Sequence, residues 1–405
     1  MKQPEKYGMI ALAAFLLLTG CGRQQDSAET EPNTMDQAAA EVSLEVGANS
    51  EAEQSLEAEA NSETGTSPER KTSSEAAEGQ VSEPTEIHLV QEGDGVMRVD
   101  AVAKMPEQGL ENVKKLTARC KVWNDADKEQ AAKILVPDAA KDAWTIDEQG
   151  AWNYQNNAEM VRIDTGIYYI RSTYDKKSYY GPTIIENFPN TYFDQGKDLG
   201  FLTVQEAEEQ AKEFLKDLGI EQVGIKRIYS VDQEKLNESV AERATEEGNE
   251  LFAEKTGLDP SDHWTEEDEY YLIEAVTEID GIEVKEFGYL RDDYTSIPGS
   301  LIEIAIGKDG VEYLATNAVY EKLEEETVSL QGPEQILEKV RGKFELLILD
   351  FEVLVEEMRL IYYPILENLE EAAATLQPVW EVQIEVEGNH INYYFDGETG
   401  KELVW

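Results

Sequence analysis

Histidine, cysteine and basic residues are scarce in this chain of 405 residues, which has three His, two Cys, and 35 Lys plus Arg against 85 Asp plus Glu. His88, His263 and His390 lie far apart and form no His-x-x-x-His pair, and two cysteines are too few for most structural zinc sites. The net charge of −50 gives a surface that repels nucleic acid and anionic lipid. We therefore expect no metal site, no cofactor and no nucleic acid partner.

Motifs of the common catalytic classes are also absent. The sequence has no Gly-x-Ser-x-Gly elbow and no glycine-rich phosphate loop. The acidic run NDADKEQ fails as an EF-hand because Gln130 and Val136 stand where Gly and Glu are required. His263, in SDHWTEEDE, has acids beside it, as chance alone produces in so acidic a chain. We predict a protein that is not an enzyme and has no catalytic residues. A hydrolase built on two carboxylates stays open as an alternative, because 85 acids always bring some pair together.

The chain begins with a short basic stretch, followed by the apolar run Met9–Leu18 and then Cys21. This run is too short to span a membrane, which takes about 20 residues. Leu-Thr-Gly-Cys, ending at Cys21, resembles a bacterial lipobox. The resemblance implies that residues 1–21 are a lipoprotein signal peptide and that the Cys21 sulfur carries acyl chains such as palmitate. We expect a protein held by this lipid in the cell membrane, on the extracellular side.

Residues 22–86 contain no Phe, Tyr or Trp and are rich in Glu, Ala and Ser. Such a segment cannot bury enough apolar surface to offset its chain entropy. We predict that it is a disordered acidic tether between the lipid and the fold. With Cys21 acylated, Cys120 has no intrachain partner for a disulfide, and its place in the alternating run LTARCKVW indicates a buried or half-buried strand position.

Folded sequence is expected from Ile87 onward, as an α+β protein of two or three consecutive modules. Each module is a helix packed on an antiparallel sheet, with boundaries at 87–187, 188–330 and 331–405. Helix starts are predicted at Asn124 or Asp125, at Thr203 with Glu206 as a capping box, and at Pro333. The second module carries a helical insertion near 233–256.

Strands are predicted where apolar residues alternate or cluster. Gly93-Asp94-Gly95 predicts a hairpin turn, and GIYYIRSTYD predicts a strand. Near the C-terminus, Trp380, Val382 and Ile384 alternate with Glu381 and Gln383. That alternation predicts a sheet with one face in contact with water.

The helix that opens with LTVQEAEEQAKEFLKDLG resembles the helix of the PepSY-like, cystatin-like module of bacterial exported proteins. VWEVQIEVEGNHINYYFDGETGKEL resembles the closing hairpin of that module, with Asp396, Thr399, Gly400 and Glu402 in its turn. The layout also looks like that of uncharacterised lipoproteins of Gram-positive, clostridia-like bacteria. The resemblance implies a non-enzymatic lipoprotein that binds or regulates a protein partner outside the membrane, such as a protease or an envelope sensor.

Aromatic residues crowd the stretch 144–180, which contains two Trp and six Tyr. Aromatic side chains are common in strands, so ordinary sheet packing accounts for them. An exposed aromatic face would instead suit a glycan or a peptide. A glycan-, peptide- or cation-binding lipoprotein is therefore the alternative function. The sequence leaves the oligomeric state open.

Overall fold

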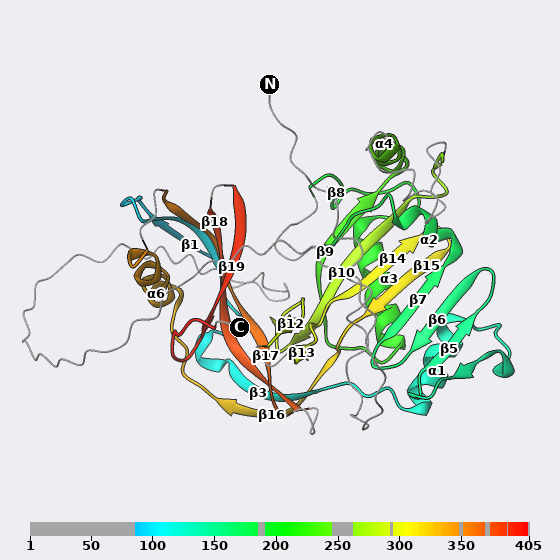
Figure 1. Cartoon of the computed structure of the whole chain (residues 1–405), viewed down its shortest axis with the longest axis horizontal. Helices are drawn as coiled ribbons and strands as arrows, with labels where there is room; N and C mark the ends of the chain where they lie inside the picture. Colours follow the sequence, from blue (N-terminus) through cyan, green and yellow to red (C-terminus); the bar gives the residue numbers. More distant parts are fainter. Residues whose placement is uncertain are drawn as a thin grey trace, which may run out of the picture. The chain divides into compact units, whose positions relative to one another are not determined.

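The computed structural model describes residues 86–184, 191–244, 262–291, 295–347, 351–368, 373–386 and 388–403, which all belong to one compact unit. In these residues, five α-helices and nineteen strands form an α+β fold with two large sheets, here named sheet A and sheet B (Figure 1). The predicted α+β class is therefore confirmed. The predicted signal peptide 1–21, with the acylation site Cys21, lies outside the described residues. The predicted tether 22–86 also lies outside them, except for Glu86.

Sheet A is built from both ends of the described chain. Its strands run in the order β1-β2-β17-β18-β3-β16, and β19 pairs with part of β18. Their bounds are β1 Glu86–Gln91, β2 Met97–Lys104, β3 Lys114–Cys120, β16 Tyr320–Thr327, β17 Val353–Asn368, β18 Ala373–Val386 and β19 Asn389–Asp396. Neighbours are antiparallel except for β2 and β17, which are parallel. The predicted hairpin at Gly93–Gly95 is confirmed, since it joins β1 to β2.

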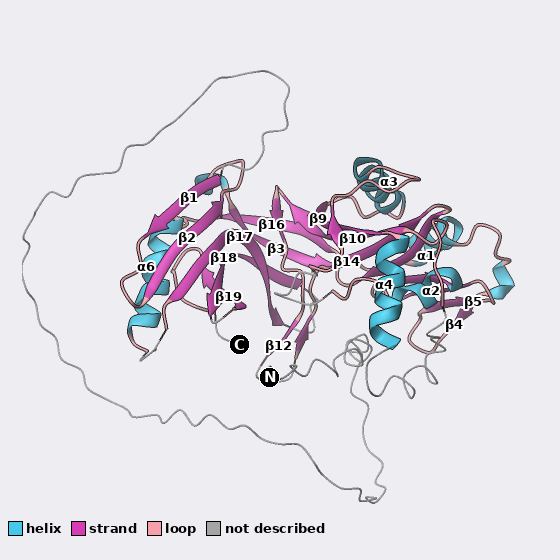
Figure 2. Cartoon of the chain, turned by 90° about the horizontal axis from the view of Figure 1, so that it is seen from above, coloured by secondary structure: helices cyan, strands magenta, loops and turns pink. Residues whose placement is uncertain are grey.

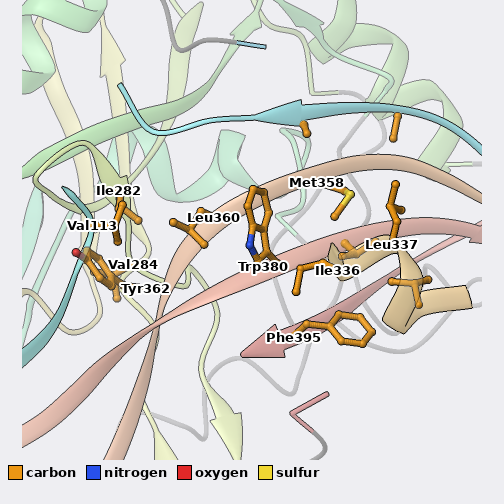
Figure 3. Close-up of a cluster of buried hydrophobic side chains, with 14 of the residues drawn as sticks. Val113, Ile282, Val284, Ile336, Leu337, Met358, Leu360, Tyr362, Trp380 and Phe395 are labelled. Atoms are coloured by element: carbon orange, nitrogen blue, oxygen red, sulfur yellow. The ribbon is translucent and has the colours of Figure 1, made fainter. Parts of the chain in front are cut away.

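Helix α6 (Pro333–Glu345) closes the core of sheet A, and it begins at Pro333 as predicted. Figure 3 shows Ile336 and Leu337 of α6 beside Met358, Trp380 and Phe395 of the strands. These side chains are almost completely buried, and each contributes on the order of 2 kcal/mol through removal of apolar surface from water. The indole N–H of Trp380 donates to the carbonyl of Gln331 at 3.0 Å, so the polar edge of the ring is satisfied as well.

Sheet B is formed by the middle of the chain, in the order β4-β5-β6-β7-β15-β14-β10-β9-β8, with β11 paired to the end of β10. The bounds are β4 Thr145–Ile146, β5 Trp152–Gln155, β6 Glu159–Ile163, β7 Ile167–Arg171, β8 Asp194–Gln195, β9 Val223–Val231, β10 Tyr270–Ile279, β11 Ile282–Glu283, β14 Ile302–Gly307 and β15 Gly310–Thr316. Strands β12 (Tyr289–Leu290) and β13 (Ser296–Ile297) form a separate ribbon. The 3₁₀-helices η2 (Leu110–Asn112) and η3 (Lys141–Ala143) lie in connections.

Helices cover the two faces of sheet B unequally. Helices α1 (Asp125–Leu135) and α3 (Val204–Asp217) pack on one face, where Ala131 and Ala211 join the core. Helices α2 (Ser172–Ser178) and α4 (Gln233–Ala244) pack on the other. Figure 2 shows α3 and α4 on opposite sides of the sheet. α2 and α4 cover this second face around Tyr229, Tyr270 and Leu272. Tyr174 of α2 also stacks on Tyr313 of β15, while Tyr168 and Glu303 on the same face are half-buried.

The predicted helix caps are confirmed. Thr203 accepts the backbone N–H of Glu206 at 3.2 Å, and the Glu206 carboxylate accepts the N–H of Thr203 at 2.9 Å. Asn124 caps α1 in the same reciprocal way with Asp127. Gly219, at φ 76°, ends α3 in a conformation that glycine adopts most readily. The predicted insertion begins with α4, and the rest of 233–256 lies outside the described residues.

Two local predictions are wrong. The strand predicted for GIYYIRSTYD ends at Arg171, and Ser172–Ser178 form α2, because Tyr174 and Lys177 lie one helical turn apart and are buried together. The face of β18 that was predicted to contact water is buried at Glu381, which is only 7% exposed. Ile361 and Tyr363 lie on that same face as part of an apolar cluster, and Tyr289 of β12 packs against it.

Two of the three predicted modules contribute strands to both sheets. Residues 87–187 supply β1–β3 to sheet A and β4–β7 to sheet B, and residues 188–330 supply most of sheet B and β16 of sheet A. Residues 331–405 supply β17–β19. The module boundaries themselves stay a prediction. Among the described helices, none has the length and the apolar composition that a membrane crossing requires.

Candidate functional site

A band of charged side chains crosses the junction between the two sheets. The sheets meet where Val284 bridges to Tyr362 of β17 and where the N–H of Lys285 donates to the Tyr362 carbonyl at 2.8 Å. The charged band consists of Glu303, Glu274, Arg227, Lys226, Glu286, Glu283, Arg359 and Glu381. It is the main group of largely buried ions in the described part of the chain, so it is the candidate functional site.

At the sheet A end, two carboxylates hold one guanidinium group. Arg359 Nε donates to Glu381 across the β17–β18 pair, and Arg359 Nη1 donates to Glu283 at 3.0 Å. Asn392 Nδ2 donates to the second carboxylate oxygen of Glu381 at 3.1 Å. Burial by itself would raise the pKa of Glu381, but the charges of Arg359 and Lys226 and the hydrogen bond from Arg359 together outweigh it and lower that pKa to about 2. This end of the band is therefore ionised and satisfied.

In the middle of the band, Glu286 receives two cations. Lys226 forms an ion pair with Glu286, and Arg227 Nη2 approaches the same carboxylate at 3.5 Å. Lys226 and Arg227 can both reach this side because β9 and β10 shift register between Glu274 and Ala275. Arg227 also donates from Nε to Glu274 at 2.5 Å, which links the middle of the band to sheet B.

At the sheet B end, two carboxylates lie side by side. Glu274 of β10 stands directly opposite Arg227 on one side and Glu303 of β14 on the other. Glu274 is 1% exposed and Glu303 is half-buried. Burial, and next the charge of Glu274, raise the pKa of Glu303 to about 7, against a slight opposing effect of a hydrogen bond from the Tyr313 hydroxyl at 3.4 Å. Burial also raises the pKa of Glu274, although Arg227 opposes the shift.

The two ends therefore differ in what they can do chemically. The sheet A end holds fixed charges that already have counter-ions. The sheet B end can take up a proton near neutral pH, or can receive a positive group from outside. No group of three or more metal-capable side chains lies together among the described residues, so the band offers no ready metal cage there.

The residues singled out in the sequence lie mostly away from this band. His88 lies on β1, His263 precedes β10 and His390 lies on β19, where its Nδ1 is 2.7 Å from a carboxylate oxygen of Glu356. Cys120 is half-buried on β3, as predicted. Asp396 Oδ1 accepts the N–H of Thr399 at 2.7 Å, so the turn of the closing hairpin is held by local bonds.

The aromatic stretch 144–180 divides into core and partly accessible residues. Tyr169, Tyr174 and Tyr180 are buried. Trp144, Trp152 and Tyr154 are half-buried and lie together, since the ring of Trp144 is 6.0 Å from that of Trp152 and 5.3 Å from that of Tyr154. Tyr168 is half-buried beside Tyr313, with the rings 5.9 Å apart and edge to face. Sheet packing thus accounts for part of the stretch, and a binding face stays open for the rest.

The residues of the charged band were missed in the sequence, although a signal for them exists. Glu274 stands in YYLIEAV and Glu303 in LIEIAIG, each a lone carboxylate within an apolar strand. Strands of this composition are buried on both faces, so a single Glu within one indicates a buried charge that needs a counter-ion or a proton.

No protein-family model matches this sequence. No curated protein matches it either. Among solved structures, the chain is similar to an uncharacterised protein from Eubacterium rectale, with 17% identity and a TM-score of 0.57 over 80% of this chain and 94% of that one. A weaker match is the C-terminal domain of YpeB from Bacillus megaterium, with 12% identity and a TM-score of 0.27 over 70% of this chain and 96% of that one. The first likeness shows a shared fold.

Proposed function

We propose that this protein is a lipid-anchored, non-enzymatic protein of the PepSY-like kind that binds a protein partner outside the membrane. The observation that favours binding is the sheet B end of the charged band, where Glu274 and Glu303 stand side by side and, in the part of the chain that the structure describes, Glu274 alone has a cation. Such a place accepts a charge from another molecule. The rest of the band is matched internally and has a structural role.

The proposed location follows from Cys21 and the apolar run before it. Intact-mass measurement of the protein from its native membrane should give a mass that starts at Cys21 and includes acyl chains. The Cys21→Ser variant should stay unacylated and fractionate without the membrane. A native protein that keeps residues 1–20, or that carries no acyl chain, would contradict the proposed anchor.

The proposed partner binding is tested by cross-linking the whole chain in the native cell envelope, followed by mass spectrometry. We expect a reproducible extracytoplasmic protein cross-linked to positions near Glu303. The Glu325→Gln variant, which removes one exposed charge on β16, serves as the matched control and should capture the same protein. Consistent failure of the native chain to enrich any protein would count against a binding role.

A glycan-binding function is the second candidate, and it is favoured by Trp144, Trp152 and Tyr154. These half-buried rings lie beside Ile146, which is 63% exposed and pairs with Trp152 across β4 and β5. Stacking on such rings is a common way to hold a sugar or a peptide. A glycan array with the native chain and with Trp152→Ala tests this function, and equal signals from the two proteins would dismiss it.

A further inference from the structure

The open end of the charged band combines two carboxylates with tyrosine rings. In the cross-strand row, Glu274 faces Glu303, Glu303 faces Ala315, and Ala315 faces Tyr168. Directly opposite residues point to the same face of an antiparallel sheet, so these side chains share one surface. Glu303, Ala315 and Tyr168 are half-buried, so solvent reaches this part of the row, and the residue between Glu303 and Tyr168 is the small Ala315.

One buried oxygen in this row has no hydrogen bond. Glu274 Oε2 accepts from Arg227 Nε, on the β9 side. Within the described part of the chain, Glu274 Oε1 is buried and has no hydrogen-bond donor. Since Arg227 occupies the β9 side, Oε1 is the oxygen left for the side that Glu303 faces. A buried carboxylate oxygen without a donor is costly and calls for one.

Among the described residues, Glu303 has no cation of its own. Its only hydrogen bond among the described residues comes from the Tyr313 hydroxyl. The nearby basic side chains serve other carboxylates, since Arg227 pairs with Glu274 and Glu286, and Lys177 pairs with the buried Glu312 at 2.6 Å. No Lys or Arg in the described ranges forms an ion pair with Glu303.

The chemistry of the row fits a nitrogen cation. Such a group supplies a positive charge and several N–H donors for two carboxylates, and its carbon chain can lie against the ring of Tyr168 or Tyr313. A calcium ion would need six to eight oxygen ligands, whereas the row itself offers the carboxylates of Glu274 and Glu303, with Asp175 of α2 near Tyr168, and no group of three or more possible metal ligands lies together among the described residues. Nitrogen cations occur on protein surfaces as lysine and arginine side chains, and free in solution as amines.

We propose that Glu303, Glu274, Tyr168 and Tyr313 form a binding site for an ammonium or guanidinium group that a lysine or arginine side chain of the partner protein presents. This inference rests on the proposed function and adds to it the chemical class of the contact. The site is named the cation site below.

A proton competes for the cation site. The pKa of Glu303 is about 7 because of its burial and the charge of Glu274, so Glu303 is mostly neutral at pH 6 and mostly ionised at pH 8. Among the described residues, the titratable and charged groups around Glu303 and the rest of the site are Glu274 of β10, Arg227 of β9, Tyr313 of β15, Tyr168 of β7, and Tyr174 and Asp175 of α2. A cation binds the ionised form better, so its affinity should rise with pH.

The test measures binding of three probes to the whole chain by NMR titration: butylammonium, butylguanidinium and a flexible Gly/Ser peptide with one central Arg. We expect the peptide to bind, with affinity about tenfold higher at pH 8 than at pH 6, because the ionised fraction of Glu303 changes by about that factor. Glu303→Gln should weaken peptide binding by about tenfold or more and remove most of the pH dependence. Glu325→Gln should leave both unchanged.

The outcomes separate this inference from the proposed function. Equal binding of the peptide by native and Glu303→Gln protein, with unchanged thermal unfolding, would overturn the cation site, and so would a lack of binding by every probe. Equal affinity for butylammonium and the peptide would overturn the assignment to a protein side chain. If Glu303→Gln still captures the envelope partner in full, the proposed function stands and the cation site is overturned. If the peptide binds as expected but no partner is captured, the cation site stands and the proposed function fails.

Discussion

The two ends of the charged band bury the same kind of side chain with opposite results. In sheet A, Glu381 lies against Arg359, and its pKa falls to about 2. In sheet B, Glu303 lies against Glu274, and its pKa rises to about 7. Burial acts to raise the pKa of both carboxyl groups, so burial alone does not explain why one pKa falls and the other rises. At Glu303 burial is the larger cause of the raised pKa and the charge of Glu274 adds to it, whereas at Glu381 the neighbouring cations together outweigh burial.

The largest change in stability is expected when Arg359 is removed from the sheet A end of the band. In Arg359→Ala, the buried Glu381 and the partly buried Glu283 lose their common counter-ion. We expect a loss of about 3–5 kcal/mol in the free energy of unfolding, measured by urea denaturation at pH 7. The double variant Arg359→Met with Glu381→Leu should be clearly more stable than the single variant, because no buried charge is left unpaired. Equal instability of the two would show that packing, not charge, holds this end.

At the sheet B end of the band, the pKa of Glu303 makes stability depend on pH. The pKa of Glu303 is about 7 in the folded chain and 4.5 for an ordinary Glu, so between these values the folded chain binds the extra proton. Its contribution to stability is complete below pH 4.5 and is lost as the pH rises through 7, with a size of up to about 3 kcal/mol. In Glu303→Gln, thermal unfolding between pH 4.5 and 7.5 should lack this contribution.

Glu381 serves as the internal control for that experiment because its pH dependence has the opposite sign. Its folded pKa of about 2 lies below the ordinary 4.5, so its contribution is present above pH 4.5 and is lost as the pH falls toward 2. Glu381→Gln should therefore lower stability by a constant amount above pH 4.5 and change the slope of the curve on the acid side only. A Glu303→Gln curve that parallels the native one from pH 4.5 to 7.5 would contradict the assignment of the neutral-pH proton to Glu303.

A smaller effect is expected from the cap of α3, which packs on the face of sheet B opposite the charged band. Thr203→Ala removes the side-chain oxygen that accepts the N–H of Glu206. We expect a loss of about 1 kcal/mol in the free energy of unfolding, with no change in the pKa of Glu303. A shifted Glu303 pKa in this variant would mean that the band responds to general loosening of sheet B. Thr203→Ser, which keeps the hydroxyl, is the matched control.

The smallest effect is expected for an exposed ion pair of sheet A. Lys104 and Glu357 lie 2.9 Å apart with side chains 44% and 36% exposed. Water and salt screen such a pair, so Lys104→Met should change the free energy of unfolding by less than about 1 kcal/mol. The small change in the free energy of unfolding expected for this exposed pair is the reference against which the larger loss in Arg359→Ala is compared. A loss from Lys104→Met that matched it would remove the distinction between buried and exposed pairs in this sheet.

Features that depend on neighbouring residues in the chain could be predicted from the sequence. The capping box at Thr203, the start of α6 at Pro333 and the hairpin at Gly93–Gly95 are all set within a few residues, and all three are confirmed. The parallel pairing of β2 with β17 could not be predicted, since it joins distant segments with no local signal. The pairing of charges in the band could not be predicted either, for the same reason. The lone Glu residues of the band can be recognised, but which one faces Arg227 and which faces another Glu depends on strand order and on a bulge in β9.

The central claim is that one buried carboxyl group in the band titrates near neutral pH while another stays ionised. The most direct measurement is a carbon-13 NMR titration of the glutamate side-chain carboxyl groups in the whole chain, with Glu303→Gln and Glu381→Gln used to assign the two signals. The account predicts a pKa of about 7 for Glu303 and about 2 for Glu381. In Glu274→Gln the pKa of Glu303 should fall but stay above 4.5, because burial is the larger cause. Two carboxyl groups that both titrate near 4.5 would contradict the account.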